Sequence, residues 1–273
     1  MFIANTSLLL LMEIIALVLF IGFVGWLAYH LQGSKKEKLL PPSFNETYRD
    51  TLLSKVHFYQ QLSPEARDQF EKRMLLFLSK VSITGVNTTV TDEDRVFVAA
   101  SAVIPIFGFP EWEYNNLNEV LLYPDSFNKD FISEEGEEKT VLGMVGNGAM
   151  QQVMVLSQPS LRQGFTNRTD KNNTGIHEFV HLMDKTDGAV DGIPENLVDK
   201  SYLLPWIRRM HENIAQIMAN RSDINPYGAT NEAEFFAVVS EYFFERPDLL
   251  ESKHPELYEL LQAIFRQHPA GEN

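Results

Sequence analysis

The strongest constraint in this sequence is the run His-Glu-Phe-Val-His at residues 177–181. Only a helix places His177 and His181 on one face, a single turn apart, where two imidazole nitrogens can bind one Zn²⁺ ion. Glu178 lies beside the pair without ligand spacing, so it is free to act as general base on a metal-bound water. The neighbouring residues are uncharged, and we therefore expect a buried helix over 172–185. The alternative is a helix whose histidines only form hydrogen bonds.

Zinc hydrolysis also needs a third protein ligand and an open coordination position. One group of zinc enzymes has a glycine and a third histidine at three and six residues after the second histidine. This chain has Asp184 and Asp187 there, so that pattern fails and Asp187 is only a rival ligand. Residues 231–245 form a second predicted helix, apolar on every side and therefore buried. Because a buried carboxylate is costly unless it is paired or binds a metal, we predict Glu234 as the third ligand.

Three further side chains have open roles. Glu241 lies seven residues after Glu234 on the same stripe, where it is expected to orient a ligand histidine or, alternatively, to form a salt bridge. Tyr227 lies in a loop and either donates a hydrogen bond to the oxyanion of a tetrahedral intermediate or is an ordinary packed tyrosine. Asp184 ends the metal helix and either supports a ligand histidine or braces the next loop.

The N-terminal residues 8–29 form an apolar run whose only ionisable residue is Glu13. A helix of this length spans roughly 33 Å, enough to cross the hydrocarbon layer. Residues 1–7 have no Lys or Arg and the run is longer than the core of a signal peptide, so we predict a retained anchor. Three lysines follow within residues 35–38, which predicts a single-pass membrane protein with its N-terminus outside and its catalytic domain in the cytoplasm.

The chain is therefore expected to have three parts: a transmembrane anchor (1–32), a polar linker (33–44) and one catalytic domain (45–273). Short apolar runs in the domain predict strands at 83–90, 119–123 and 153–157. Helices are predicted from Ser63, from Thr91 through 96–103, and over 172–185, 195–220, 231–245 and 254–267. Strands early and helices late indicate the α+β class. The acidic segment 128–139 is expected to be a loop.

The composition narrows the chemistry further. The chain has 37 acidic and 23 basic residues, a formal net charge of −14, so we expect no nucleic-acid partner. It has no cysteine, which excludes disulfides, iron–sulfur clusters, thiolate zinc sites and cysteine nucleophiles. Any metal is therefore held by nitrogen and oxygen ligands.

Several motifs in the chain together resemble one protein family. The sequence HEFVHLMD, the Asp-Gly turn after it and the stretch AEFFAVVSEYFF resemble the Mlc titration factor A family of zinc-dependent peptidases. NLNEVLLYPDSF at 116–127 and the helix start at Ser63 are also similar to that family, so the resemblance covers about residues 45–268. It implies a zincin-like metallopeptidase fold and an aminopeptidase-like activity on peptides.

The resemblance also implies roles for individual residues. One zinc ion per chain would be bound by His177, His181 and Glu234, with Glu178 as the base. The family is itself similar to the catalytic domain of anthrax lethal factor, in which a tyrosine seven residues before the glutamate ligand assists catalysis. Tyr227 has this spacing from Glu234.

Three functional hypotheses follow. The first is a membrane-anchored zinc peptidase that acts on a peptide or protein substrate and contacts the lipid bilayer through residues 8–29. The second is a membrane-tethered regulatory module with a structural or vestigial zinc site that sequesters a protein partner such as a transcriptional repressor, the kind of partner the resemblance implies. The third is zinc-dependent hydrolysis of a non-peptide amide. The presence of Glu178 favours the first, because a vestigial site has no reason to keep the base.

Overall fold

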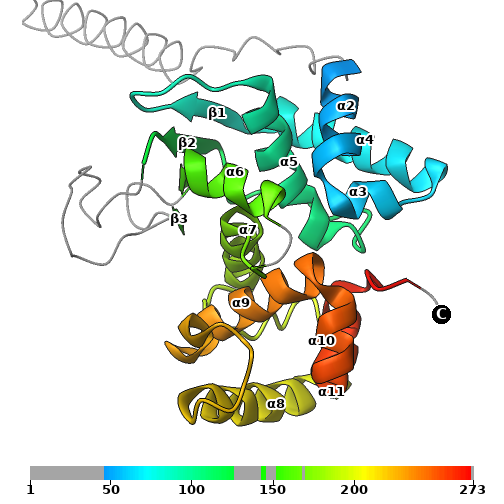
Figure 1. Cartoon of the computed structure of the whole chain (residues 1–273), viewed down its shortest axis with the longest axis vertical. Coiled ribbons are helices and arrows are strands. Elements are labelled where there is room, and N and C mark those ends of the chain that lie inside the picture. The colour runs from blue at the N-terminus through cyan, green and yellow to red at the C-terminus, as the bar shows by residue number, and fades with distance from the viewer. Residues whose placement is uncertain (1–45, 126–142, 146–151, 168–169, 272–273) are drawn as a thin grey trace, which may run out of the picture. The chain divides into compact units, whose positions relative to one another are not determined.

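The computed structural model describes residues 46–125, 143–145, 152–167 and 170–271 (Figure 1). All of them lie in Pro41–Asn273, the second of two compact units into which the chain divides. The predicted anchor at 8–29, the linker and the acidic segment 128–139 lie outside the described residues. Within the described ranges, no helix is both long enough and apolar enough to cross a bilayer.

A four-stranded sheet has the order β1-β2-β4-β3. Its strands are β1 (Ser82–Gly85), β2 (Glu119–Tyr123), β3 (Gly143–Val145) and β4 (Val153–Ser157). The first, second and fourth strands are parallel, with Ile83 opposite Val120 and Val120 opposite Met154, and β3 pairs with β4 in the antiparallel sense. The connection from β1 to β2 contains a helix, α5 (Asp92–Ile106), as is usual between parallel strands.

One predicted strand is too long. The run at 83–90 was expected to be extended throughout, but β1 ends at Gly85. The chain turns there because Asn87 adopts a left-handed backbone, with φ of 55°. A Cβ atom on Gly85 would lie 2.2 Å from the carbonyl oxygen of Thr88, so only glycine fits this turn.

Helices make up most of the remaining structure. They are α2 (Glu46–Lys55), α3 (His57–Gln61), α4 (Pro64–Lys80), α5 (Asp92–Ile106), α6 (Gln158–Thr166), α7 (Thr174–Asp184), α8 (Lys200–Met218), α9 (Glu232–Glu245), α10 (Pro247–Lys253) and α11 (Pro255–Phe265). The caps predicted at Ser63 and Thr91 are confirmed: Ser63 accepts the N–H of Ala66, and Thr91 forms a capping box with Asp94. A helix-rich domain with a small sheet confirms the α+β class.

Helix α7 runs through the middle of the domain, between the part that contains the sheet and α5 and the part that contains α9 (Figure 1). On one side Phe179 packs against Phe77 and Tyr114, at ring-centroid distances of 5.6 and 5.0 Å. On the other side α7 packs against α9, which is covered in turn by α8, α10 and α11. The predicted burial of α9 is confirmed, because every residue from Phe235 to Phe244 is buried. The core therefore holds α7 and α9 in fixed register.

Candidate metal centre

The start of α7 is fixed by Asn173 and Gly175. The side-chain oxygen of Asn173 accepts the N–H of Ile176 at 3.1 Å, and its amide nitrogen donates to Glu245 at 2.8 Å. A Cβ atom on Gly175 would lie only 2.1 Å from Oγ of Ser101 on α5, so glycine allows the two helices to pack closely. The first turn of α7 is therefore positioned by α5 on one side and by the end of α9 on the other.

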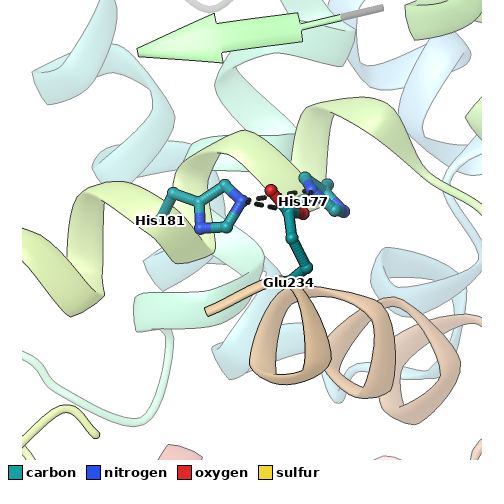
Figure 2. Close-up of side chains that lie close together, drawn as sticks. All are labelled: His177, His181 and Glu234. Atoms are coloured by element: carbon teal, nitrogen blue, oxygen red, sulfur yellow. Dashed lines mark hydrogen bonds and ion pairs between the residues drawn. The ribbon is translucent and has the colours of Figure 1, made fainter. Parts of the chain in front are cut away.

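Helix α9 begins at a similar cap. The side chain of Asn231 accepts the N–H of Glu234 at 2.9 Å. Glu234 thus lies in the first turn, at the end of α9 that faces the histidines of α7. Figure 2 shows its carboxylate reaching up between the two imidazoles.

The three predicted ligands converge. His177 Nε2 lies 3.0 Å from Glu234 Oε2 and 3.1 Å from His181 Nε2, and His181 Nε2 lies 3.5 Å from the same carboxylate oxygen. A tetrahedral zinc ion with bonds of about 2.0–2.1 Å separates its ligand atoms by about 3.3 Å. Two imidazoles and one carboxylate are also a usual zinc donor set. Both the chemistry and the spacing therefore fit one divalent ion.

Glu241 lies directly behind the first histidine. Its Oε1 is 2.7 Å from Nδ1 of His177, and its Oε2 accepts the backbone N–H of Asn173. This contact favours the predicted histidine-orienting role, because a hydrogen bond to Nδ1 leaves Nε2 facing the candidate metal position.

The histidines and carboxylates of the candidate site shift one another's pKa values. Burial by itself lowers the pKa of His177, but the carboxylates of Glu241 and Glu234 outweigh it and raise the pKa well above its usual value. Burial raises the pKa of Glu234, but hydrogen bonds from His177 and His181 outweigh it and lower the pKa. A divalent cation would take the place of these imidazole protons, since metals bind neutral imidazole.

Glu178 lies beside the group but is not part of it. Among the described residues, the group that could hold a metal ion consists of His177, His181 and Glu234. The side chain of Glu178 is 5% exposed, and burial raises its pKa. A carboxylate whose pKa is raised toward neutrality is better suited to accept and return a proton.

Tyr227 lies on the short 3₁₀ helix η3 (Pro226–Ala229), next to the same group. Its ring centroid is 6.0 Å from that of His177. Partial burial and the nearby Glu234 and Glu178 raise the pKa of its phenol to about 12. The residue is 52% exposed, which distinguishes it from a tyrosine packed in the core. Its phenol therefore remains a hydrogen-bond donor at neutral pH, at an accessible edge of the site.

The two aspartates after α7 have other partners. Asp184 is fully buried, and its Oδ2 accepts the N–H of Gly192 at 2.8 Å, so it braces the next loop. Asp187 accepts the backbone N–H groups of Ala189 and Glu195 at 3.1 Å each. It does not belong to the candidate metal group, and these bonds give it the ordinary role of a turn residue.

The polar contacts that hold the Tyr227 loop were not predicted from the sequence; they involve Asn172, Asp223 and Asn225. Asn225 accepts the N–H of Tyr227, and an asparagine directly before a proline is a turn signal that could have indicated this role. The partners of Asp223 come from three separate segments, so no local pattern indicated them.

Two imidazoles lie on one helix, a carboxylate comes from a second helix, and a further buried glutamate lies beside them. This arrangement places the domain in the class of metallopeptidase-like proteins. The chain belongs to the family described as glucose-regulated metallo-peptidase M90, whose model matches residues 31–266. This is the family of Mlc titration factor A.

Individual relatives agree with this assignment. The chain is 32% identical over 260 residues to the uncharacterized protein slr2042 of Synechocystis sp., covering 91% of this chain and 92% of the relative. It is 27% identical to Mlc titration factor A of Pectobacterium atrosepticum, covering 77% and 80% of the two chains. For the protein of the same name from Serratia proteamaculans the identity is 26%, with 66% and 71% covered.

Proposed function

We propose that this protein is a membrane-anchored, zinc-dependent peptidase with aminopeptidase-like activity. The observation that carries the proposal is the convergence of His177, His181 and Glu234, whose ligand atoms all lie within 4.8 Å of one another. The buried residue Glu178 lies next to them. Membership of a metallopeptidase family supports the same function. One zinc ion per chain fits the donor set and the distances between its atoms.

When bound, zinc lowers the pKa of a water molecule toward about 7 and polarises the substrate carbonyl. Glu178 takes the proton of the attacking water and passes it to the nitrogen of the leaving amine. Tyr227 donates a hydrogen bond to the carbonyl oxygen as negative charge develops there. Glu241 keeps the His177 ring in the orientation that directs Nε2 to the metal position.

The test uses the purified full chain in detergent. We expect about one zinc per chain and cleavage of peptides that a chelator abolishes and zinc restores. Glu178→Gln should lower turnover by about 10²–10⁴-fold while the zinc content stays the same, because the variant removes the base but no ligand. Wild-type activity in Glu178→Gln would overturn the assignment. Cleavage of non-peptide amides, with peptides left intact, would assign the same chemistry to a different substrate class.

The membrane anchor and the cytoplasmic location belong to the same proposal. They rest on the 22-residue apolar run at 8–29 and on the lysines that follow it. The full chain should remain in the membrane fraction after alkaline extraction. In sealed vesicles whose lumen corresponds to the cytoplasm, the domain should resist added protease until detergent is present.

A second candidate function is binding of a protein partner, because several relatives are named Mlc titration factor A. Under this alternative the chain sequesters a transcriptional repressor and its zinc site is structural or vestigial. Stoichiometric zinc without chelator-sensitive cleavage of any peptide in a broad library would favour binding. Cleavage that depends on Glu178 would favour the peptidase.

A further inference from the structure

The segment that carries Tyr227 is anchored at Asp223, outside the metal centre. The Asp223 carboxylate accepts hydrogen bonds from Lys171 at 2.8 Å, Tyr242 at 2.9 Å, Lys253 at 3.0 Å and His254 at 2.7 Å. Burial raises the pKa of Asp223, but these donors outweigh it and hold the pKa far below its usual value. Asp223 lies between α8 and η3. It therefore connects this segment to the loop before α7, to α9 and to the junction between α10 and α11.

Two residues further on, Asn225 connects the tyrosine to the metal helix. Its side-chain oxygen accepts the N–H of Tyr227 at 3.0 Å. Its amide nitrogen donates to the side-chain oxygen of Asn172 at 2.9 Å. Asn172 directly precedes Asn173, the cap of α7, whose backbone N–H donates to Glu241. One side chain therefore joins the backbone of Tyr227 to the residues that orient His177.

The tyrosine needs such a connection more than the metal ligands do. Tyr227 lies on a single turn of 3₁₀ helix and is half exposed, so packing of its own side chain restricts its position only in part. Gly228 is buried and packs on Val238 of α9, which holds the backbone from one side. Asn225 holds it from the side of α7 and so sets the distance between the phenol and the imidazoles.

We propose that Asn225 is a positioning residue for the step that Tyr227 assists, acting through its paired bonds to Tyr227 and Asn172. The proposal rests on the proposed function, since it takes the Tyr227 phenol to be the oxyanion donor. A donor displaced by about 1 Å can lose a large part of its catalytic effect, so the expected consequence lies in turnover rather than in zinc binding.

The first experiment is a double-mutant cycle in the zinc-loaded full chain. Tyr227→Phe should lower kcat by about 10²–10³-fold, as for other oxyanion donors. Asn225→Ala should lower kcat by about tenfold, with KM and zinc content unchanged. In the Tyr227→Phe background the same change should cost less than about twofold, because the phenol that it positions is already absent.

Two variants separate positioning from folding. Asn172→Ala removes the inter-segment bond but leaves the cap on Tyr227, and it should give part of the Asn225→Ala loss, again only when Tyr227 is present. Asp199→Ala is the matched control, because Asp199 is exposed and caps α8 through the same bond to a backbone N–H two residues later. It should leave kcat unchanged. Equal losses from Asn225→Ala in both backgrounds, or no loss in either, would overturn the proposal.

A binding measurement distinguishes failure of this proposal from failure of the proposed function. A peptide hydroxamate chelates zinc through two oxygens, one of which takes the place of the substrate carbonyl. Calorimetry on the zinc-loaded chain should show weaker hydroxamate binding for Tyr227→Phe and for Asn225→Ala, and no further weakening when the two are combined. If the wild type binds the hydroxamate and the variants show this pattern, but no peptide is cleaved, the peptidase function fails and the positioning role stands. Additive weakening would refute the positioning role.

Discussion

The two sides of the candidate site are built differently. The metal-binding side lies where α7 packs on α9, and its side chains come from two buried helices held by the aromatic core. The tyrosine side lies on η3, a single turn that packs on α9 through Gly228. Its half-exposed Tyr227 is also held by hydrogen bonds that the side chains of Asn225 and Asp223 accept. Helix packing dominates at the first side, whereas the second side depends more on polar contacts.

This difference has a physical consequence. Ligand atoms on two packed helices move only if the core rearranges, whereas a hydrogen-bonded turn can shift by a fraction of an ångström at small cost. Changes at the first side should therefore act on metal binding, and changes at the second side should act on turnover with the metal still in place.

The largest effect should come from Glu234→Ala, which tests whether packing places a ligand. Removing the only carboxylate of the candidate set should reduce zinc affinity by more than the 10–100-fold typical of residues that support a ligand. Glu232→Ala is the control, because Glu232 is exposed in the same first turn and does not belong to the metal group. Competition with a chelator of known affinity measures both. Equal zinc affinity in the two variants would contradict the proposed ligand set.

A smaller effect is expected from Glu241→Gln, which keeps the shape of the side chain but removes its charge. The amide can still contact Nδ1 of His177, though it no longer matches both that ring and the backbone N–H of Asn173. Zinc affinity should fall by about 10–100-fold. Isothermal titration with zinc measures this affinity, and the same experiment on Asn225→Ala should show no loss of zinc affinity. A loss of zinc affinity in Asn225→Ala would break the distinction between the two sides.

The last prediction concerns the stability of the domain and its dependence on pH. Burial raises the pKa of Asp184 to about 6, so the folded state holds this proton more tightly than the unfolded chain does. Its contribution to stability therefore falls as the pH rises from about 4 to above 6, by up to about 3 kcal/mol. The pKa of Asp223 is lowered, so its contribution is present at neutral pH and is lost only in stronger acid.

Urea unfolding of the wild type and of Asp184→Asn over pH 4 to 7 tests this prediction. The free energy of unfolding of the wild type should fall relative to that of the variant as the pH rises. A difference that does not vary with pH would mean that Asp184 ionises with an ordinary pKa and that its burial in the loop brace has little energetic effect.

Much of the metal-binding side could be predicted from the sequence because its signals are local. The spacing of His177 and His181 requires a helix to bring them together, and Asn173 caps that helix through a bond to Ile176 only three residues away. The run from Phe235 to Phe244 is apolar on every side, which already indicated burial. Glu234 was predicted from that burial, and the family resemblance then implied the same residue.

Only the tertiary structure decided how the distant segments meet. Glu234 and His177 are 57 residues apart, and Asn225 and Asn172 are 53 apart, so neither contact follows from a local pattern. The same holds for the left-handed turn that ends β1 at Gly85, because the neighbouring residues have strand character. Local sequence determines which helices form and which faces they bury, because these depend on spacing and caps. The partner of each polar side chain depends on packing across the whole domain.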